Sequence, residues 1–214
     1  MSTREKILEE ALSLFSVRGY DPVSVRDIAY AVGIKESSLY NHFKNKQDIF
    51  DTLLREYSAR WDAFFADIRL TGEDRQFTVD DRTIQMYQNM SNEQFSAMAG
   101  LIFDQYMTDE VNVKLRRMLT IEQYRNKDVA ALFRRVSFDD SLEFQAKLFE
   151  ALIEVGCFIR TNPYILALEF FSPIFLLFYK YDGDPESLRE AKALFLRHID
   201  HFNNIYGVSN GKEV

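Results

Sequence analysis

The sequence predicts an all-α protein, and three features of the chain support this fold class. Glycine and proline are scarce, with 8 and 4 among 214 residues, so helix-breaking positions are few. Apolar residues recur at three- and four-residue steps, and no alternating pattern typical of strands persists. Capping residues precede several of these stretches. At this length the chain can bury a sizeable core as one large domain or two small ones.

The first predicted helix runs from Thr3 to Arg18. Ser2 and Glu5 have the spacing of a capping box, and Gly19 follows the last turn as a stop signal. Apolar side chains at helical spacing predict an inner face made of Ile7, Leu8, Ala11, Leu14 and Phe15.

Two short helices joined by a tight turn are predicted next. Ser24 can cap the first of them, with Asp27 near the positive end of its dipole. Gly33 follows directly, where the chain must leave the helix in a left-handed conformation. Leu39 and Phe43 lie four residues apart and predict the buried face of the second helix. This arrangement is typical of a helix-turn-helix, which places its second helix in the major groove of DNA.

The outward face of that second helix carries hydroxyl, amide, imidazole, phenol and ammonium groups. Such groups donate to phosphates or read base edges. A merely solvated helix would explain Ser37 or Asn41 alone, whereas their combination with Tyr40 and His42 favours a surface that contacts DNA. The predicted DNA-binding residues are Arg26, Lys35, Ser37, Ser38, Tyr40, Asn41, His42, Lys44 and Lys46.

A long helix is predicted from Lys46 to about Arg69. Asn45 has the position of its N-cap, with Asp48 at the third helical position. The backbone N–H groups of Lys46 and Gln47 would then lie at a helix N-terminus, where a phosphate can bind. Its apolar stripe makes the helix a rigid connection between the N-terminal module and the rest of the chain: Phe50, Leu53, Leu54, Tyr57, Trp61, Phe64, Phe65 and Ile68.

The run from Gly33 to Ile49, with its core LYNHFKNK, resembles the signature of the tetracycline-repressor (TetR) family of bacterial transcription regulators. The resemblance covers about the first quarter of the chain, Thr3 to Leu54. It implies phosphate contacts for the residues that match Ser38, Tyr40, His42 and Lys46, and base or backbone contacts for Lys35, Ser37 and Asn41.

The chain departs from the family pattern at Lys35 and Glu36, where a small hydroxyl residue and then a basic residue are more usual. An acidic Glu36 beside DNA is unfavourable unless it accepts from a cytosine amino group or stabilises the helix N-terminus. The operator sequence is therefore left open.

Further helices are predicted along the remaining chain. Ser137 or Asp139 should open a helix that ends near Ile159, and Asn162-Pro163 and Asp184-Pro185 should start the last two helices. These last two end near Tyr181 and Tyr206. The preceding helices are expected at Val79–Met90, Asn92–Met107, Asp109–Tyr124 and Lys127–Val136, after a loop near Thr71–Asp74, and the tail Ser209–Val214 should be frayed.

The segment Tyr164–Tyr181 is almost wholly apolar over 18 residues, which raises the alternative of a membrane span. Glu169 and Pro173 lie inside it and no comparable basic flank follows, so we interpret it as a core or dimer-facing helix outside any membrane. The family resemblance implies a homodimer whose last two helices pair with their copies. The interface would include Leu168, Phe171, Leu188, Phe195, His198 and Phe202.

The body is rich in aromatic side chains on several helices. Core packing accounts for most of them, and the alternative for some is an apolar cavity for a small apolar or amphipathic effector. The sequence does not separate these two roles. The predicted effector-binding residues are Trp61, Phe65, Phe103, Tyr106, Met107, Tyr124, Phe149 and Phe175.

Enzymatic chemistry finds little support in the sequence. No phosphate-cradling glycine loop, serine nucleophile motif or Cys/His cluster is present, and the pair His198 and His201 is more simply an interface or solvated pair than a metal site. We therefore expect no catalytic residues, no metal and no cofactor. The polar start of the chain and its single cysteine, Cys157, favour a reducing cytoplasm.

Charge and motif together predict a two-part organisation. Residues 1–50 carry equal numbers of acidic and basic side chains, so the net charge of −7 lies in residues 51–214. A neutral DNA-binding module gains little from non-specific phosphate attraction and should bind as a dimer. We expect a helix-turn-helix domain at 1–50 and a helical ligand-binding and dimerisation domain at 51–214. The predicted function is a ligand-responsive repressor that leaves its operator on binding a small molecule; the alternative is a body that makes protein–protein contacts.

Overall fold

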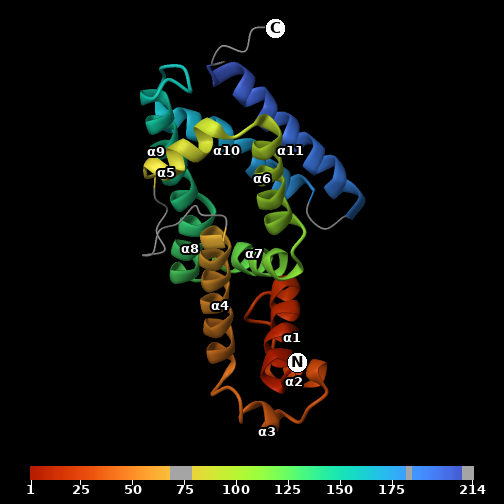
Figure 1. Cartoon of the computed structure of the whole chain (residues 1–214). Coiled ribbons are helices and arrows are strands. Elements are labelled where there is room, and N and C mark those ends of the chain that lie inside the picture. The colour runs from red at the N-terminus through yellow and green to blue at the C-terminus, as the bar shows by residue number, and fades with distance from the viewer. Residues whose placement is uncertain (68–78, 182–184, 209–214) are drawn as a thin grey trace. The chain divides into compact units, whose positions relative to one another are not determined.

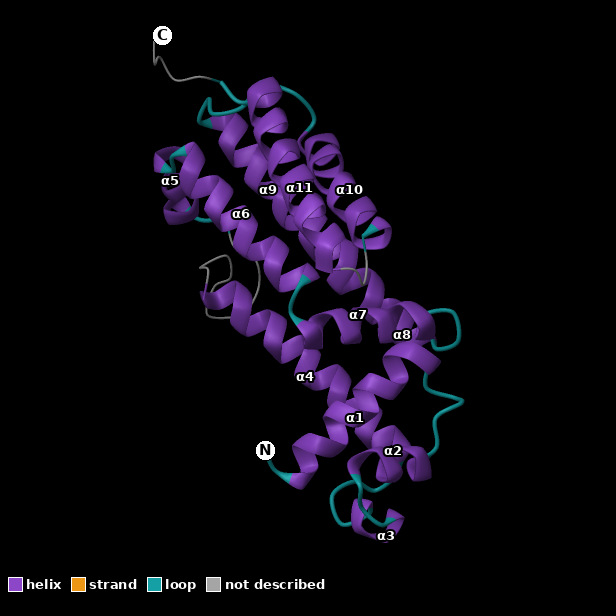
Figure 2. Cartoon of the chain, turned by 90° about the vertical axis from the view of Figure 1, so that its right-hand side faces the viewer, coloured by secondary structure: helices purple, strands orange, loops and turns teal. Residues whose placement is uncertain are grey.

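The computed structural model describes residues 1–67, 79–181 and 185–208, and their regular structure is helical apart from one bridge pair, Phe158 and Gly207 (Figure 2). The all-α prediction is confirmed. Packing divides the chain into two compact units. The first comprises Met1–Asp67 with Glu110–Arg135, and the second Ile68–Asp109 with Val136–Val214. The predicted loop near Thr71 and the predicted tail lie outside the described residues.

The first unit holds the N-terminal helices together with two helices from the middle of the chain (Figure 1). Within it, α1 packs against α2, α4 and α7. Its core contains Ile7, Phe15, Ile28 and Leu39, all fully buried. Its helices are α1 (Thr3–Arg18), α2 (Val25–Val32), α3 (Glu36–Leu39), α4 (Lys46–Asp67), α7 (Glu110–Glu122) and α8 (Lys127–Arg134).

The predicted capping signals act as expected in this unit. Ser2 and Glu5 form a capping box at the start of α1, and Ser24 and Asp27 form another at the start of α2. Gly33 ends α2 in the left-handed region, with φ +77°. The predicted inner face of α1 is wrong at one position, because Leu12 is buried whereas Leu14 is only partly buried.

The second unit is built around the long helices α6, α9, α10 and α11. In it, α10 packs against α9 and α11, α11 packs against α6, and α5 packs against α9. Asn162 caps α10 as predicted, since its side-chain oxygen accepts from the N–H groups of Tyr164 and Ile165. The helices are α5 (Asp81–Asn89), α6 (Asn92–Met107), α9 (Asp140–Glu154), α10 (Pro163–Lys180) and α11 (Pro185–Tyr206).

Two predicted helix ends near α9 are wrong. A π-helical turn, η1 (Arg135–Asp139), joins α8 to α9 without a break, so no new helix is capped at Ser137 or Asp139. Asp139 itself has helical dihedral angles, φ −62° and ψ −52°, and makes no capping hydrogen bond. A π-helical turn accommodates an extra residue within a continuing helix. The helix then ends at Glu154 rather than near Ile159, before Gly156 turns the chain with φ +78°.

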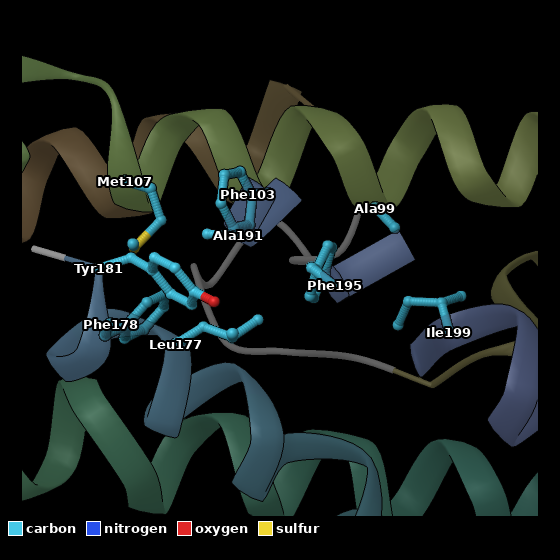
Figure 3. Close-up of a cluster of buried hydrophobic side chains, with 9 residues drawn as sticks. All are labelled: Ala99, Phe103, Met107, Leu177, Phe178, Tyr181, Ala191, Phe195 and Ile199. Atoms are coloured by element: carbon cyan, nitrogen blue, oxygen red, sulfur yellow. The ribbon is translucent and has the colours of Figure 1, made fainter. Parts of the chain in front are cut away.

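The core of the second unit includes two clusters of buried side chains. The larger joins α6, α10 and α11 (Figure 3). In it, the rings of Phe103 and Phe195 lie 5.4 Å apart. The smaller is centred on Phe149 and Phe202, whose rings also lie 5.4 Å apart, and includes Leu166 and Ala167.

Helix α10 is long and apolar enough to cross a membrane by length and composition, and 28% of it is buried within the protein. Core helices of soluble proteins meet the same criteria. Glu169 and Pro173 lie inside the helix.

Candidate nucleic-acid interface

The polar side chains predicted to contact DNA lie on and next to a short helix, beside two buried anchors. Helix α3 has only four residues, and the chain continues in turns that bring the N–H groups of His42 and Phe43 to the carbonyl of Leu39, at 2.9 and 3.1 Å. Leu39 and Phe43 are buried, as predicted. The Arg4 guanidinium lies over the Phe43 ring, 5.1 Å from the ring centre.

The turn before α3 has the geometry that the sequence predicts. The Gly33 N–H donates to the carbonyl of Tyr30 at 3.1 Å, and the Ile34 N–H donates to that of Ala29 at 3.0 Å. These two bonds close the end of α2, so the chain can reverse within a few residues. The turn therefore holds α2 and α3 in a fixed relation.

Most predicted DNA-binding side chains are accessible. Lys35, Ser37, Asn41, His42 and Lys44 are exposed, as are Arg26 on α2 and half of Tyr40, whereas Ser38 is partly buried. Within the described part of the chain, no side-chain hydrogen bond or ion pair is seen for Lys35, Ser37 or Asn41. Their donors are therefore available to a ligand.

Lys46 lies differently from the other predicted residues. Its ammonium group donates to the carbonyl oxygens of Tyr20 at 2.8 Å, Asp21 at 3.3 Å and Val23 at 2.8 Å. It also lies 4.0 Å from the centre of the Tyr20 ring. An ammonium has three donors, and three carbonyls accept them here. The phosphate contact that the family resemblance implies for Lys46 therefore competes with these carbonyls.

The N-terminus of α4 is capped as the sequence predicts. The Asn45 side-chain oxygen accepts from the Asp48 N–H at 2.8 Å. The Asp48 carboxylate in turn accepts from the Lys44 N–H at 3.0 Å. These hydrogen bonds fix the backbone between Phe43 and α4, and they therefore restrict where the exposed Lys44 side chain can lie.

Hydrogen bonds and burial shift the pKa values of Asp27 and Tyr20 in this module. Asp27 accepts from the backbone N–H and the hydroxyl of Ser24, at 2.8 and 2.7 Å, which holds the pKa of its carboxyl below its usual range. Burial raises the pKa of the Tyr20 phenol, and the nearby carboxylate of Asp51 adds to the effect. The Asp27 carboxylate is therefore charged when it caps α2.

The predicted effector-binding residues are not gathered at one place. Phe103 and Met107 are buried in the larger cluster of the second unit, and Tyr106 stacks on Phe178 with ring centres 5.2 Å apart. Phe149 belongs to the smaller cluster, and Phe175 packs beside the larger one.

The other three residues of this set, Trp61, Phe65 and Tyr124, belong to the first unit. Trp61 packs edge-on against Tyr57, with ring centres 6.1 Å apart. Tyr124 is 86% exposed, so its predicted place in an enclosed apolar cavity is wrong. The side chain of Phe65 lies outside the described residues.

A surface cleft of about 440 Å³ lies between α9 and the start of α10. Its lining contains none of the predicted effector-binding residues. It is formed by Asp139, Leu142, Glu143, Ala146, Lys147, Glu150, Asn162, Pro163 and Tyr164.

The predicted dimer residues fall into two groups. Phe171, Phe195 and Phe202 are buried within a single chain and therefore have little surface left for a partner. Leu168, Leu188 and His198 are partly buried, and the His198 ring nitrogen lies 2.9 Å from the Phe170 carbonyl oxygen.

Exposed apolar side chains on one side of α10 were not predicted from the sequence. Leu176 and Tyr179 are 63% and 52% exposed, and Ile165 lies on the same side of the helix at helical spacing. The exposed Glu169 and Ser172 lie between Ile165 and Leu176. The signal for these apolar side chains was available in their helical spacing. It was masked because the whole segment is apolar.

Among the described residues, no group of three or more His, Cys, Asp or Glu side chains could hold a metal ion. His198 and His201 lie on α11, where His198 is engaged with the backbone of α10.

The N-terminal module is similar to known regulatory proteins. Residues 7–53 match the family model "Bacterial regulatory proteins, tetR family". The chain is 35% identical over 77 residues to IcaR of Staphylococcus epidermidis, the negative transcriptional regulator of the biofilm operon icaADBC, and 46% identical over 48 residues to IcaR of Staphylococcus aureus. These matches cover 36% and 22% of this chain, and the chain spans 40% and 26% of the length of those relatives.

Solved structures resemble the whole fold. The SmeT–triclosan complex aligns with a TM-score of 0.63 at 20% identity, over 98% of this chain and 94% of that one. SmeT is the repressor of a multidrug efflux pump of Stenotrophomonas maltophilia. The ketosteroid regulator KstR2 of Mycobacterium tuberculosis aligns with a TM-score of 0.61 at 19% identity, over 97% and 96% of the two chains. The N-terminal module, residues 7–53, is therefore similar to the tetR family of bacterial regulatory proteins, and the solved structures share the all-helical fold of the chain.

Proposed function

We propose that the chain is a DNA-binding transcriptional regulator that responds to a small molecule, and that it acts as a repressor. The observation that carries this proposal is the exposed row of donors on and after α3, held in place by the buried Leu39 and Phe43. Exposed donors on a helix that is anchored from behind suit contacts with phosphates and base edges. The match of residues 7–53 to regulatory proteins supports the same function.

We propose that residues 1–50 contact DNA and that residues 51–214 bind the effector and a second copy of the chain. The module at 1–50 has no net charge, so a single copy should bind a polyanion weakly. Two copies on two half-sites would supply the missing affinity. The exposed side chains of Ile165, Leu176 and Tyr179 on α10 mark the surface that we assign to the homodimer.

The proposed mechanism is a dimer with two states. An effector that enters the body shifts the helices around it, α4 tilts, and the distance between the two recognition helices changes. Major-groove half-sites repeat about every 34–36 Å, so a mismatch of a few ångströms loses one half-site. The neighbour SmeT was solved with triclosan, which supports an apolar or amphipathic effector. Such a regulator would act in the cytoplasm without catalytic activity or a cofactor.

Selection from random double-stranded DNA tests the proposal directly. The parent protein should enrich a sequence with two related half-sites. Lys35→Ala or Asn41→Ala should change the preferred bases at one position of each half-site, by about 1–3 kcal/mol for each lost bidentate contact. If the parent enriches no sequence, the proposal is overturned. If both variants keep the parent's sequence preference, Lys35 and Asn41 contact only the DNA backbone.

The alternative function is a body that binds another protein instead of an effector. A thermal-shift screen of apolar and amphipathic compounds separates the two. A compound that raises the melting temperature and releases the selected DNA supports effector sensing, because a ligand stabilises the state that it binds. If no compound does both, while a protein partner releases the DNA, the alternative holds.

A further inference from the structure

The turn between α1 and α2, residues 19–23, is held from two sides by helices that lie outside the α2–α3 pair. Lys46, the first residue of α4, donates to three of its carbonyls. From the other side, the Glu122 carboxylate at the end of α7 accepts from the Tyr20 N–H at 2.7 Å. Tyr20 therefore binds α7 through its N–H and α4 through its carbonyl.

Glu122 is suited to this contact by its burial. Its carboxylate side chain is 3% exposed, and a buried carboxylate requires hydrogen bonds or an opposite charge. The Tyr20 N–H supplies a hydrogen bond, and the Arg125 guanidinium supplies the opposite charge at 3.9 Å. The same guanidinium lies 3.9 Å from Asp21, so Glu122 at the end of α7 and Arg125 just after it hold the turn at two successive residues.

Gly19 shows how closely α7 approaches the turn. Its φ is +78°, and a Cβ built on it would lie 2.9 Å from the Glu122 carboxylate oxygen. A side chain there would strain the backbone and push the carboxylate away. The turn and the Glu122 side chain at the end of α7 therefore pack together without space for a side chain at residue 19.

The Tyr20 ring completes the connection. It lies 4.9 Å from the ring of Phe50 on α4 and 5.5 Å from that of Phe15 on α1, and the Lys46 ammonium covers its face. Displacement of Tyr20 would therefore disturb α1, the start of α4 and the beginning of α2 together.

We propose that Glu122 and Lys46 are positioning residues that act through Tyr20, so that α7 helps to hold the DNA-contacting module in its binding geometry. The proposal rests on the DNA-binding function proposed above and extends it to a helix outside the helix-turn-helix. It assigns Lys46 a contact with the protein backbone and leaves phosphate contact to its exposed neighbour Lys44.

The first test uses DNA selected by the parent protein and measures affinity over a range of salt concentrations. Lys46→Met should weaken binding about tenfold while the salt slope stays unchanged, because no ion pair with phosphate is lost. The matched control Lys44→Met removes an exposed ammonium and should lower the salt slope by about one. A salt slope lowered by about one in Lys46→Met would overturn the positioning role.

The second test addresses Glu122. Glu122→Leu leaves the Tyr20 N–H without its acceptor and should weaken binding about tenfold, with the salt slope again unchanged. Glu122→Gln keeps an acceptor oxygen and should restore most of the affinity. Because both residues act through Tyr20, the double variant Glu122→Leu/Lys46→Met should lose little more than the single variants do. Fully additive losses of binding free energy would overturn the claim that both residues act through Tyr20.

Amide hydrogen exchange of the free protein tests the connection without DNA. The Tyr20 amide should exchange at least tenfold faster in Glu122→Leu, and it should also exchange faster in Lys46→Met, which does not touch that amide. Unchanged Tyr20 exchange in Lys46→Met would refute the connection even if DNA binds. If the parent selects no DNA while the exchange behaves as expected, the proposed function fails and the connection stands.

Discussion

The segment 35–43 and helix α10 both expose side chains, but of opposite chemistry. The N-terminal segment exposes an ammonium, an amide and an imidazole above the buried Leu39. Helix α10 exposes Leu176 and Tyr179 beside the buried Leu177 and Phe178. The first surface suits a charged, hydrogen-bonding partner, and the second suits another apolar surface. The difference fits the proposed division between DNA contact at the N-terminal segment and self-association at α10.

Phe195→Ala should have the largest effect of the substitutions that examine this comparison. Phe195 is 2% exposed and packs on Phe103, so its truncation leaves a cavity and should lower the free energy of unfolding by about 3–5 kcal/mol. Urea unfolding measures the change. Leu176→Ala serves as the control and should change protomer stability by less than about 0.5 kcal/mol. An equal loss in both variants would mean that Leu176 belongs to the core.

Leu176→Arg should disrupt the homodimer without unfolding the protomer. A charge placed in an apolar interface has no partner, and the free energy of association should weaken by about 3 kcal/mol. Analytical ultracentrifugation measures the dimer population. Leu101→Arg, at a similarly exposed leucine on α6, is the matched control and should sediment like the parent. Sedimentation of Leu176→Arg as a parent-like dimer would place the interface elsewhere.

Ser24→Ala should have the smallest of these effects on stability. The Ser24 hydroxyl accepts from the Asp27 N–H at 3.1 Å at the start of α2, and loss of such a cap costs about 1 kcal/mol. Thermal unfolding measures the change. Ser37→Ala removes an exposed hydroxyl from the DNA-contacting face and should affect DNA binding but leave the melting temperature unchanged. A lower melting temperature in Ser37→Ala would indicate a structural role for that residue.

Much of the N-terminal module could be predicted from the sequence because its signals are local. Ser2 with Glu5, Ser24 with Asp27, and Gly33 act within a few residues of their own position. The exposed donors on and next to α3 follow from the spacing along the chain once Leu39 and Phe43 are taken as anchors. These features depend on the backbone near each residue and hardly at all on distant segments.

The roles of Lys46 and Glu122 could not be predicted in the same way, since their partners lie 26 and 102 residues away from them in sequence. The π-helical turn at Arg135–Asp139 likewise overrode a local capping signal at Ser137 and Asp139. In α10, nearly every residue is apolar, so spacing alone did not separate Phe178 in the core from Leu176 on the surface.

The sequence by itself determined the all-helical class, the start of most helices and the chemistry of the face that we propose contacts DNA. The tertiary structure decided which apolar side chains are buried and which charged side chains bind the backbone. The physical reason is that capping and helical periodicity act over a few residues, whereas burial and long-range hydrogen bonds exist only after distant helices pack together.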